Sequence, residues 1–311
     1  MTLESQSPRL IAVTGATGLI GAALVARFRA RGHVVRRLLR SAKNATPDDV
    51  VWDPASGAPP AGALEGVDAV VHLAGEPVAH RWTQARKRAI RDSRVRSTEH
   101  LAAALGRLST RPRVFLSGSA VGYYGDRGDL PVDETAAPGS DFLARVCADW
   151  EAAAAPIADA GVRLVLMRTG IVLSPHGGAL QRLLPIFRLG GGGPLGSGRQ
   201  WMSWIGLTDQ VRAIEHALFT ESVSGPANLV APNPVTNAEF AATLGRVLVR
   251  PALVPVPSFA LELLYGEMAR ATLLSGQRAL PRVLAAAGFE FAAPTLEAAL
   301  RVEIESERVR E

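Results

Sequence analysis

Three glycines recur at three-residue spacing near the start of the chain, in the segment Gly15-Ala16-Thr17-Gly18-Leu19-Ile20-Gly21. Glycine lets a backbone turn pass close to a bound pyrophosphate, because it has no Cβ to obstruct the approach. A helix that begins at such a turn offers unpaired backbone N–H groups and a positive dipole end to the same anion. The spacing therefore indicates a site for a phosphate-bearing ligand such as a dinucleotide.

The residues on either side of the glycines predict a strand, a helix and a second strand. Residues 10–13 are an apolar run typical of a strand buried on both faces, and apolar residues then recur at four-residue spacing from Ile20 to Phe28. Gly32 offers a helix stop before the β-branched residues 34–35. This βαβ context is the one that a phosphate-binding turn requires. A glycine-rich turn without a ligand is the alternative.

The end of the second predicted strand, residues 34–39, favours NADP over NAD. An acidic side chain at that point accepts hydrogen bonds from the ribose hydroxyls of NAD, whereas a basic one suits the 2′-phosphate of NADP. Here Arg40 and Ser41 follow the strand, Lys43 is close behind, and no carboxylate occurs before Asp48. A solvated loop arginine is the alternative for Arg40.

Composition and charge limit the functions that the chain can have. The 311 residues are 48% hydrophobic and 20% charged, which is typical of a globular protein and excludes disorder, collagen and coiled coil. Thirty-four basic residues oppose 29 acidic ones, so the charge of +5 gives little support for nucleic-acid binding. The single cysteine, Cys147, excludes an internal disulfide and a cysteine-built zinc site. We expect it to be a small buried apolar residue, and we assign no metal ligand.

The sequence predicts neither a signal peptide nor a membrane helix. Residues 1–9 are polar, and no run of 18 apolar residues occurs without a charge. We therefore expect a soluble, cytoplasmic protein that acts on a small molecule, with no membrane or nucleic-acid partner. The oligomeric state is left open.

Several segments, in this order, resemble the extended and atypical short-chain dehydrogenase/reductases, the superfamily of the nucleotide-sugar epimerases. They are the G-x-x-G-x-x-G turn, residues 68–75, the serine- and tyrosine-bearing segment 114–125, and residues 204–209. Finer features are similar to a bacterial subgroup described as NAD-dependent epimerase/dehydratase-like, whose C-terminal segment has no known function. These features are Ala74 to Pro77, Ser93-Arg94, Trp150-Glu151, residues 192–198 and residues 237–240. The resemblance covers nearly the whole chain.

The resemblance implies an α/β fold, a Rossmann doubly wound parallel sheet with a smaller discontinuous C-terminal substrate lobe. It assigns residues 9–175 to the dinucleotide-binding domain, to which residues 201–219 return. Residues 176–200 and 220–311 are expected to form the lobe, which includes the C-terminal segment 251–298. The turn and the resemblance together predict a set of cofactor-binding residues, namely Gly15, Thr17, Gly18, Leu19, Ile20, Gly21, Arg40, Ser41, Ala74, Gly75 and Glu76.

The catalytic pair of this superfamily is missing. Its members use a tyrosine four residues before a lysine, whose ammonium lowers the phenol pKa so that the phenol can exchange a proton with the substrate. Tyrosine occurs here only at positions 123, 124 and 265, and lysine only at 43 and 87, so no pair has that spacing. Phe142 and Val146 stand at the nearest equivalent positions. Either the proton donor has moved or the chain has none.

Ser119 and Tyr123 are the catalytic residues that we predict in place of that pair. Ser119 matches the substrate-polarising serine of the superfamily if Tyr123 is aligned with the tyrosine of its Tyr-Gly signature. A second alignment uses Tyr124 and puts Ala120 in the serine position. For Tyr124, packing beside a glycine is the stronger alternative.

Four other polar residues near these positions are weighed against structural roles. His72 lies inside an apolar run and is expected to be a core histidine bonded to backbone. Glu151 is expected to anchor a helix. Asp133 and Glu134 are candidate carboxylates, for which solvated turn residues are the alternative.

Substrate contacts are predicted at Arg94, Gln200 and Trp201. Residues 81–96 form a basic helical stretch whose charges are expected mostly to face solvent, but the Ser93-Arg94 pair belongs to the subgroup resemblance. Arg94 is therefore assigned to a substrate anion or to the cofactor phosphates. Gln200 and Trp201 follow a glycine-rich loop that the resemblance places over the substrate, with packing as the alternative.

Two functions follow from these observations. The first is an NADP-dependent oxidoreductase or epimerase that acts on a hydroxyl or carbonyl compound. An anionic compound and a nucleotide sugar are both candidates for this substrate. The second is a non-catalytic NADP-binding redox sensor or partner-binding module, which the missing catalytic pair suggests.

Overall fold

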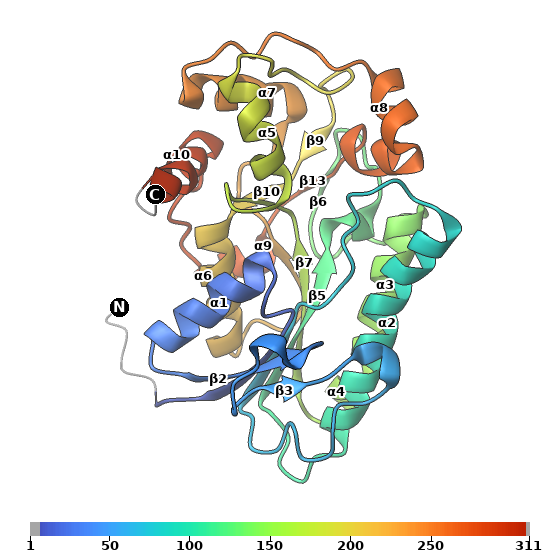
Figure 1. The fold of residues 1–311 in the computed structure, drawn as a ribbon, viewed down its shortest axis with the longest axis vertical. Helices are drawn as coiled ribbons and strands as arrows, with labels where there is room; N and C mark the ends of the chain where they lie inside the picture. Colours follow the sequence, from blue (N-terminus) through green and yellow to red (C-terminus); the bar gives the residue numbers. More distant parts are fainter. Residues whose placement is uncertain (1–6, 309–311) are drawn as a thin grey trace.

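A seven-stranded parallel sheet forms the centre of the protein in the computed structural model, which describes residues 7–308 (Figure 1). The strand order is β11-β7-β5-β4-β1-β2-β3. The strands are β1 (Leu10–Thr14), β2 (Val34–Leu39), β3 (Val50–Val51), β4 (Ala69–His72), β5 (Val114–Ala120), β7 (Arg163–Thr169) and β11 (Gly225–Leu229). The chain leaves β1 toward β2 on one side and returns to β4 on the other, so the carboxyl ends of β1 and β4 flank the crevice where open α/β sheets bind ligands.

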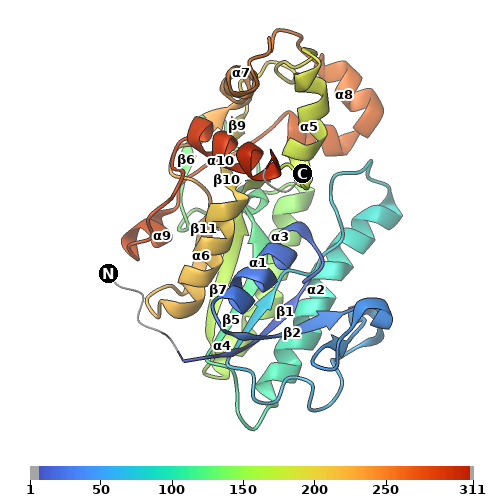
Figure 2. The same ribbon diagram turned by 60° about the vertical axis from the view of Figure 1, so that its left-hand side comes forward.

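Helices cover both faces of this sheet (Figure 2). One face carries α1 (Leu19–Ala30), α6 (Leu207–Phe219) and α9 (Arg282–Ala286), and the other carries α2 (Gln84–Gly106), α3 (Phe142–Ala154) and α4 (Pro156–Asp159). Successive residues of β1 point to opposite faces: Ile11 packs in the core with Phe28 of α1, whereas Ala12 packs in the core with Leu101 of α2. Both faces are apolar because both are covered, which explains the continuous apolar run of β1.

A smaller lobe stands at the carboxyl ends of the strands (Figure 1). Its helices are α5 (Gly178–Arg188), α7 (Asn237–Leu248), α8 (Ser258–Tyr265), the π-helical turn η4 (Ala269–Leu273) and α10 (Leu296–Arg308). Three two-stranded sheets join the lobe to the loops of the first domain: β8 (Ile171–Leu173) with β10 (Trp204–Gly206), β9 (Trp201–Met202) with β12 (Val235–Thr236), and β6 (Pro131–Val132) with β13 (Arg278–Ala279). Single turns of 3-10 helix, η1 (Ala42–Asn44), η2 (Pro54–Ser56) and η3 (Val121–Tyr124), complete the elements.

The predicted fold class is confirmed, but the chain returns to the main sheet more often than expected. Residues 220–311 were expected in the lobe, whereas β11 pairs with β7 over the register Gly225 to Leu229. Leu284 and Phe289 also pack in the core beside α1 and α6. The backbone hydrogen bonds that β7 offers along its outer edge are satisfied by β11, and α9 then covers that strand. Within residues 7–308, no helix has the length and apolarity needed to cross a bilayer.

Candidate functional site

The glycine turn connects β1 to α1, and two of its three glycines are required by close backbone contacts. Gly15 has φ +65°, and a Cβ there would lie 2.8 Å from the carbonyl oxygen of Leu73 at the end of β4. A Cβ at Gly21 would lie 2.2 Å from the carbonyl oxygen of Gly15, so this glycine brings α1 against the turn. A Cβ at Gly18 would meet only that same oxygen, at 3.3 Å. Gly15 and Gly21 are therefore required by the fold, while Gly18 leaves space open.

Helix α1 begins directly after Gly18 without a capping side chain, and its first turn holds no acidic residue. The backbone N–H groups of a first helical turn have no partner within the helix. An uncapped N-terminus with a positive dipole end is suited to an anion such as a pyrophosphate.

A cavity of about 750 Å³ lies at the carboxyl ends of β1, β2 and β4. Its size is within the range of small-molecule and cofactor sites. Of the predicted cofactor residues, the cavity is lined by Gly15, Thr17, Gly18, Arg40, Ser41, Ala74, Gly75 and Glu76. Leu19 instead packs toward Gly177, and Ile20 toward the sheet core. Helix α2 adds lining residues that we did not predict, Ala89, Asp92, Ser93 and Arg96. The basic stretch 81–96 was the available signal for Arg96.

The basic end of the cavity lies after β2. The Arg40 side chain is 76% exposed, and its Nη1 lies 3.4 Å from Oε1 of Glu76. Ser41 and Lys43 line the same end of the cavity. Asp49, which follows Asp48 in the chain, is bound to Arg37. The hydrogen bonds from Arg37 lower the pKa of the Asp49 carboxyl. Cationic side chains therefore line the cavity after β2, at the position where a carboxylate would select NAD.

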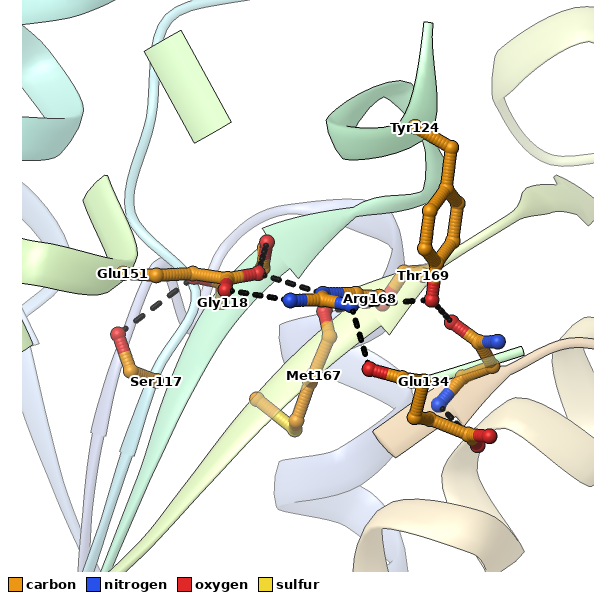
Figure 3. A network of polar contacts seen from close by, with 10 residues as sticks. Ser117, Gly118, Tyr124, Glu134, Glu151, Met167, Arg168 and Thr169 are labelled. Carbon is orange, nitrogen blue, oxygen red and sulfur yellow. Dashed lines mark hydrogen bonds and ion pairs between the residues drawn. The ribbon is translucent and has the colours of Figure 1, made fainter. Parts of the chain in front are cut away.

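A buried polar network lies at the adjacent ends of β5 and β7 (Figure 3). Arg168 of β7 binds Glu151 of α3 with both ends of its guanidinium fork: Nε donates to Oε1 and Nη2 to Oε2, each at 2.8 Å. Ser119 Oγ donates to Glu151 Oε1 at 2.6 Å. All three residues are buried: Arg168 is 2% exposed, Glu151 8% and Ser119 5%. Ser119 is therefore committed to a carboxylate that a buried cation holds in place.

The two neighbouring tyrosines differ in their surroundings. Tyr124 is completely buried, its phenol donates to Oδ1 of Asn228 at 2.7 Å and accepts from Nη1 of Arg168 at 3.1 Å, and burial raises its pKa to about 12. Tyr123 is half-buried with its ring centroid 3.5 Å from the Arg168 guanidinium, and its phenol has no hydrogen-bond partner within residues 7–308. The packing role preferred for Tyr124 agrees with this geometry, whereas the Tyr123 hydroxyl is available to a ligand.

His72 is a buried core residue, as expected, but its partners are hydroxyls and not backbone. Nδ1 lies 2.7 Å from Thr14 Oγ1, and Nε2 lies 3.1 Å from Ser97 Oγ. The backbone partner that we expected is wrong: neighbouring backbone groups are used by the parallel sheet, and the two ring nitrogens meet hydroxyls from β1 and α2. Burial lowers the pKa of His72 to about 3, so it is neutral near pH 7.

The remaining candidate acids and the cysteine have structural environments. Glu134 Oε1 accepts from the backbone N–H groups of Asn228 and Val283, at 3.0 and 3.2 Å. Asp133 caps its own turn through Thr135. Cys147 is buried, as expected, and burial raises its pKa to about 12.

Arg94 lies behind Gly75 and is not part of the cavity wall. A Cβ at Gly75 would be 3.1 Å from Arg94 Cζ, and the guanidinium stacks on Trp150 with Cζ 5.2 Å from the ring centroid. Nη1 donates to the carbonyl oxygen of Ile90 at 3.0 Å, and within the described part of the chain no carboxylate pairs with Arg94. Burial lowers the pKa of this guanidinium. A half-buried cation without a carboxylate thus lies next to the predicted cofactor residue Gly75.

Gln200 makes contacts within the lobe, whereas Trp201 contacts the loop before β6 of the first domain and Arg278 of β13. Gln200 Nε2 donates to the carbonyl oxygens of Leu195 and Leu273, at 3.0 and 2.7 Å. Trp201 Nε1 donates to Oδ1 of Asp129 at 2.8 Å, and its ring stacks on Arg278. These contacts favour the packing alternative for both residues.

Sequence reasoning missed the Glu151–Arg168 pair as part of the site. Glu151 was expected only to anchor its helix, and no role was predicted for Arg168. A signal was present, because an arginine inside the apolar run 163–169 must be paired when the strand is buried. Its partner could not be identified, since any of several carboxylates fits that requirement.

Comparisons with known proteins show the family of this chain. Residues 11–229 match the family model described as the NAD dependent epimerase/dehydratase family, and residues 256–302 match a domain of unknown function, DUF1731. An epimerase family protein of Mycobacterium bovis is 47% identical over 292 residues, which are 94% of this chain and 96% of that protein.

Two solved structures are similar throughout this chain. The crystal structure of the human epimerase family protein SDR39U1 with NADPH is 37% identical with a TM-score of 0.87, and the match covers 95% of this chain and 99% of that one. The nucleoside-diphosphate sugar epimerase from Corynebacterium glutamicum is 39% identical with a TM-score of 0.79, over 96% of this chain and 58% of that one. This chain therefore belongs to the NAD dependent epimerase/dehydratase family, with a DUF1731 segment at its C-terminal side.

Proposed function

We propose that the protein is an NADP-dependent oxidoreductase or epimerase that acts on a hydroxyl or carbonyl compound. The observation that carries this proposal is the cavity at the ends of β1, β2 and β4, where an uncapped helix N-terminus and the cations Arg40 and Lys43 are suited to a dinucleotide with a third phosphate. The human SDR39U1 structure that contains NADPH supports the same cofactor.

Arg40 is suited to a 2′-phosphate because its present partner is weak. Its contact with Glu76 is exposed and 3.4 Å long, and exposed pairs of this kind contribute only about 0.2–1 kcal/mol. A phosphate dianion offers stronger, bidentate acceptors to a guanidinium. Asp49 does not compete for the ribose hydroxyls, since Arg37 binds it.

When bound, the nicotinamide would supply or accept a hydride, and the residues of this chain would handle the substrate oxygen. Ser119 donates its single hydrogen to Glu151, so its lone pairs remain to accept a hydrogen bond from a substrate hydroxyl. Arg168 fixes Glu151, which makes Glu151 and Arg168 positioning residues for Ser119. The Tyr123 phenol would donate to the developing oxyanion.

Cofactor titration tests the first part of this proposal. We expect NADPH to bind more tightly than NADH, and Arg40→Ala to weaken NADPH binding by about tenfold with little effect on NADH, since one charged hydrogen-bond partner is lost. Calorimetry with each cofactor measures this, with Arg107→Ala as an exposed arginine control outside the cavity. Equal losses for both cofactors, or a wild-type preference for NADH, would contradict NADP selection.

The second candidate is a non-catalytic NADP-binding sensor or partner-binding module. It is favoured by Phe142 and Val146, whose apolar side chains at the positions of the missing pair cannot donate a proton. A crystal structure with NADPH separates the two. An enzyme requires an ordered nicotinamide whose ring lies in contact with the carbon of a substrate held by Ser119 and Tyr123, so that a hydride can pass between them, whereas a module requires only the contacts on the adenine side.

A further inference from the structure

The positions of the missing catalytic pair are covered by the C-terminal segment. Val146 belongs to one buried apolar cluster with Trp82, Ile90 and Met268, and Phe142 packs against this cluster. Met268 lies in the DUF1731 segment and is only 3% exposed. Phe142 and Val146, which stand at the positions of the catalytic pair, therefore form part of an apolar site that Met268 of the C-terminal segment occupies. We call this site the Met268 seat.

A charged contact lies beside this seat. Lys87 of α2 places Nζ 2.7 Å from Oε1 of Glu267, the residue before Met268. The same ammonium is 4.9 Å from the ring centroid of Phe142 and 5.8 Å from that of Trp82. Cation–π contacts and an ion pair thus hold one lysine between the first domain and the C-terminal segment.

The loop of residues 77–83 lies beside α8 of the same segment (Figures 1 and 2). This loop continues directly from Glu76 and Pro77, which line the cavity. Nη1 of Arg81 donates to the carbonyl oxygen of Leu263 in α8 at 2.9 Å, and Trp82 Nε1 closes the loop on the carbonyl oxygen of Val78. The position of the loop at the cavity edge therefore depends on α8 and η4.

Helix α8 has little packing of its own. Leu261 is its only buried residue, whereas Phe259, Leu263 and Leu264 are 73%, 74% and 64% exposed. Elements with few buried apolar contacts open at low free-energy cost relative to the rest of a fold. The Met268 seat, the Lys87–Glu267 contact and the Arg81–Leu263 hydrogen bond attach this part of the lobe to α2 and the loop.

We propose that residues 258–273, within the domain of unknown function, form a gate on cofactor exchange. With Met268 seated and Glu267 bound to Lys87, the loop 77–83 is held at the cavity edge and retains the cofactor. When the segment detaches, the loop is released and the cofactor can leave or enter. This gate depends on the proposed function in one respect, namely that NADPH is the ligand of the cavity.

Stopped-flow displacement of NADPH tests the gate. Glu267→Gln is expected to raise the NADPH dissociation rate about fivefold without slowing association. A change of this size corresponds to the loss of one partly exposed ion pair. Glu297→Gln is the matched control, because it removes an exposed carboxylate that pairs with Arg246 and Arg301 elsewhere in the lobe. Amide hydrogen exchange of the ligand-free protein should accelerate at residues 77–83 in Glu267→Gln and not in the control.

Each result decides between the two proposals. If NADPH binds the wild type but Glu267→Gln leaves both its dissociation and the exchange of residues 77–83 unchanged, the gate is wrong and the proposed function stands. Equal acceleration in Glu297→Gln would also overturn the gate, since the effect would then be a general loosening of the lobe. If the wild type does not bind NADPH, the proposed function fails, and the gate on cofactor exchange fails with it.

Discussion

Acidification should destabilise the protein through His72. Thr14 Oγ1 accepts hydrogen bonds from the backbone N–H groups of Leu73 and Ala74, so its own hydrogen is directed at Nδ1 of His72. Nε2 then carries the ring proton toward Ser97, and the imidazole is neutral. A second ring proton would face the Thr14 hydrogen inside a completely buried site. Protonation of the folded state is therefore strongly disfavoured.

The size and sign of the effect follow from the two pKa values. Burial lowers the pKa of His72 from 6.5 to about 3 in the folded state, so the unfolded chain binds the proton first as the pH falls. The neutral imidazole contributes its full stability above the pKa that His72 has in the unfolded chain. This contribution is lost as the pH falls below that value, and the loss is complete below the pKa that His72 has in the folded state. At pH 5, about 1.5 units below the unfolded pKa, the loss is about 2 kcal/mol.

Urea unfolding of the wild type and of His72→Asn, at a series of pH values from 7.5 to 5, measures this contribution. The free energy of unfolding of the wild type should fall by about 2 kcal/mol more than that of the variant over this range, because asparagine does not titrate. His80→Asn, a change at an exposed histidine, is the control and should retain the wild-type slope. Parallel pH profiles for the wild type and His72→Asn would refute the inferred neutral, buried imidazole.

Three further predictions concern the candidate site. Gly18→Val should abolish NADPH binding while the circular dichroism spectrum stays native, since its side chain would enter the phosphate site; binding that survives would mean that the dinucleotide site is misplaced. Arg94→Gln should weaken NADPH binding in calorimetry about tenfold, and well beyond the exposed Arg88→Gln, because it removes a positive charge behind Gly75 that attracts the cofactor phosphates; equal small effects would leave Arg94 a structural residue. Once a substrate is known, Tyr123→Phe should lower turnover about tenfold and Tyr124→Phe less, because the Tyr124 phenol is buried; equal losses would contradict the assignment.

Features that depend on neighbouring residues could be predicted from the sequence. The strand before Gly15, the helix after Gly18 and the strand that ends at Leu39 lie where periodicity and turn chemistry predict them. The family resemblance extended this to the doubly wound parallel sheet and to the C-terminal segment, expected at residues 251–298 and matched at 256–302. Basic residues after the second strand were likewise recognisable, because the chain itself places them at the strand end.

Contacts between distant parts of the chain were decided only by the tertiary structure. The Glu151–Arg168 pair joins α3 to β7, the partners of His72 come from β1 and α2, and Lys87 meets a carboxylate 180 residues later. Periodicity shows that such a side chain is buried but does not show which face of a neighbouring element it meets. Burial requires each of these polar groups to find a partner, and only the packing of the sheet, the helices and the lobe determines which partner that is.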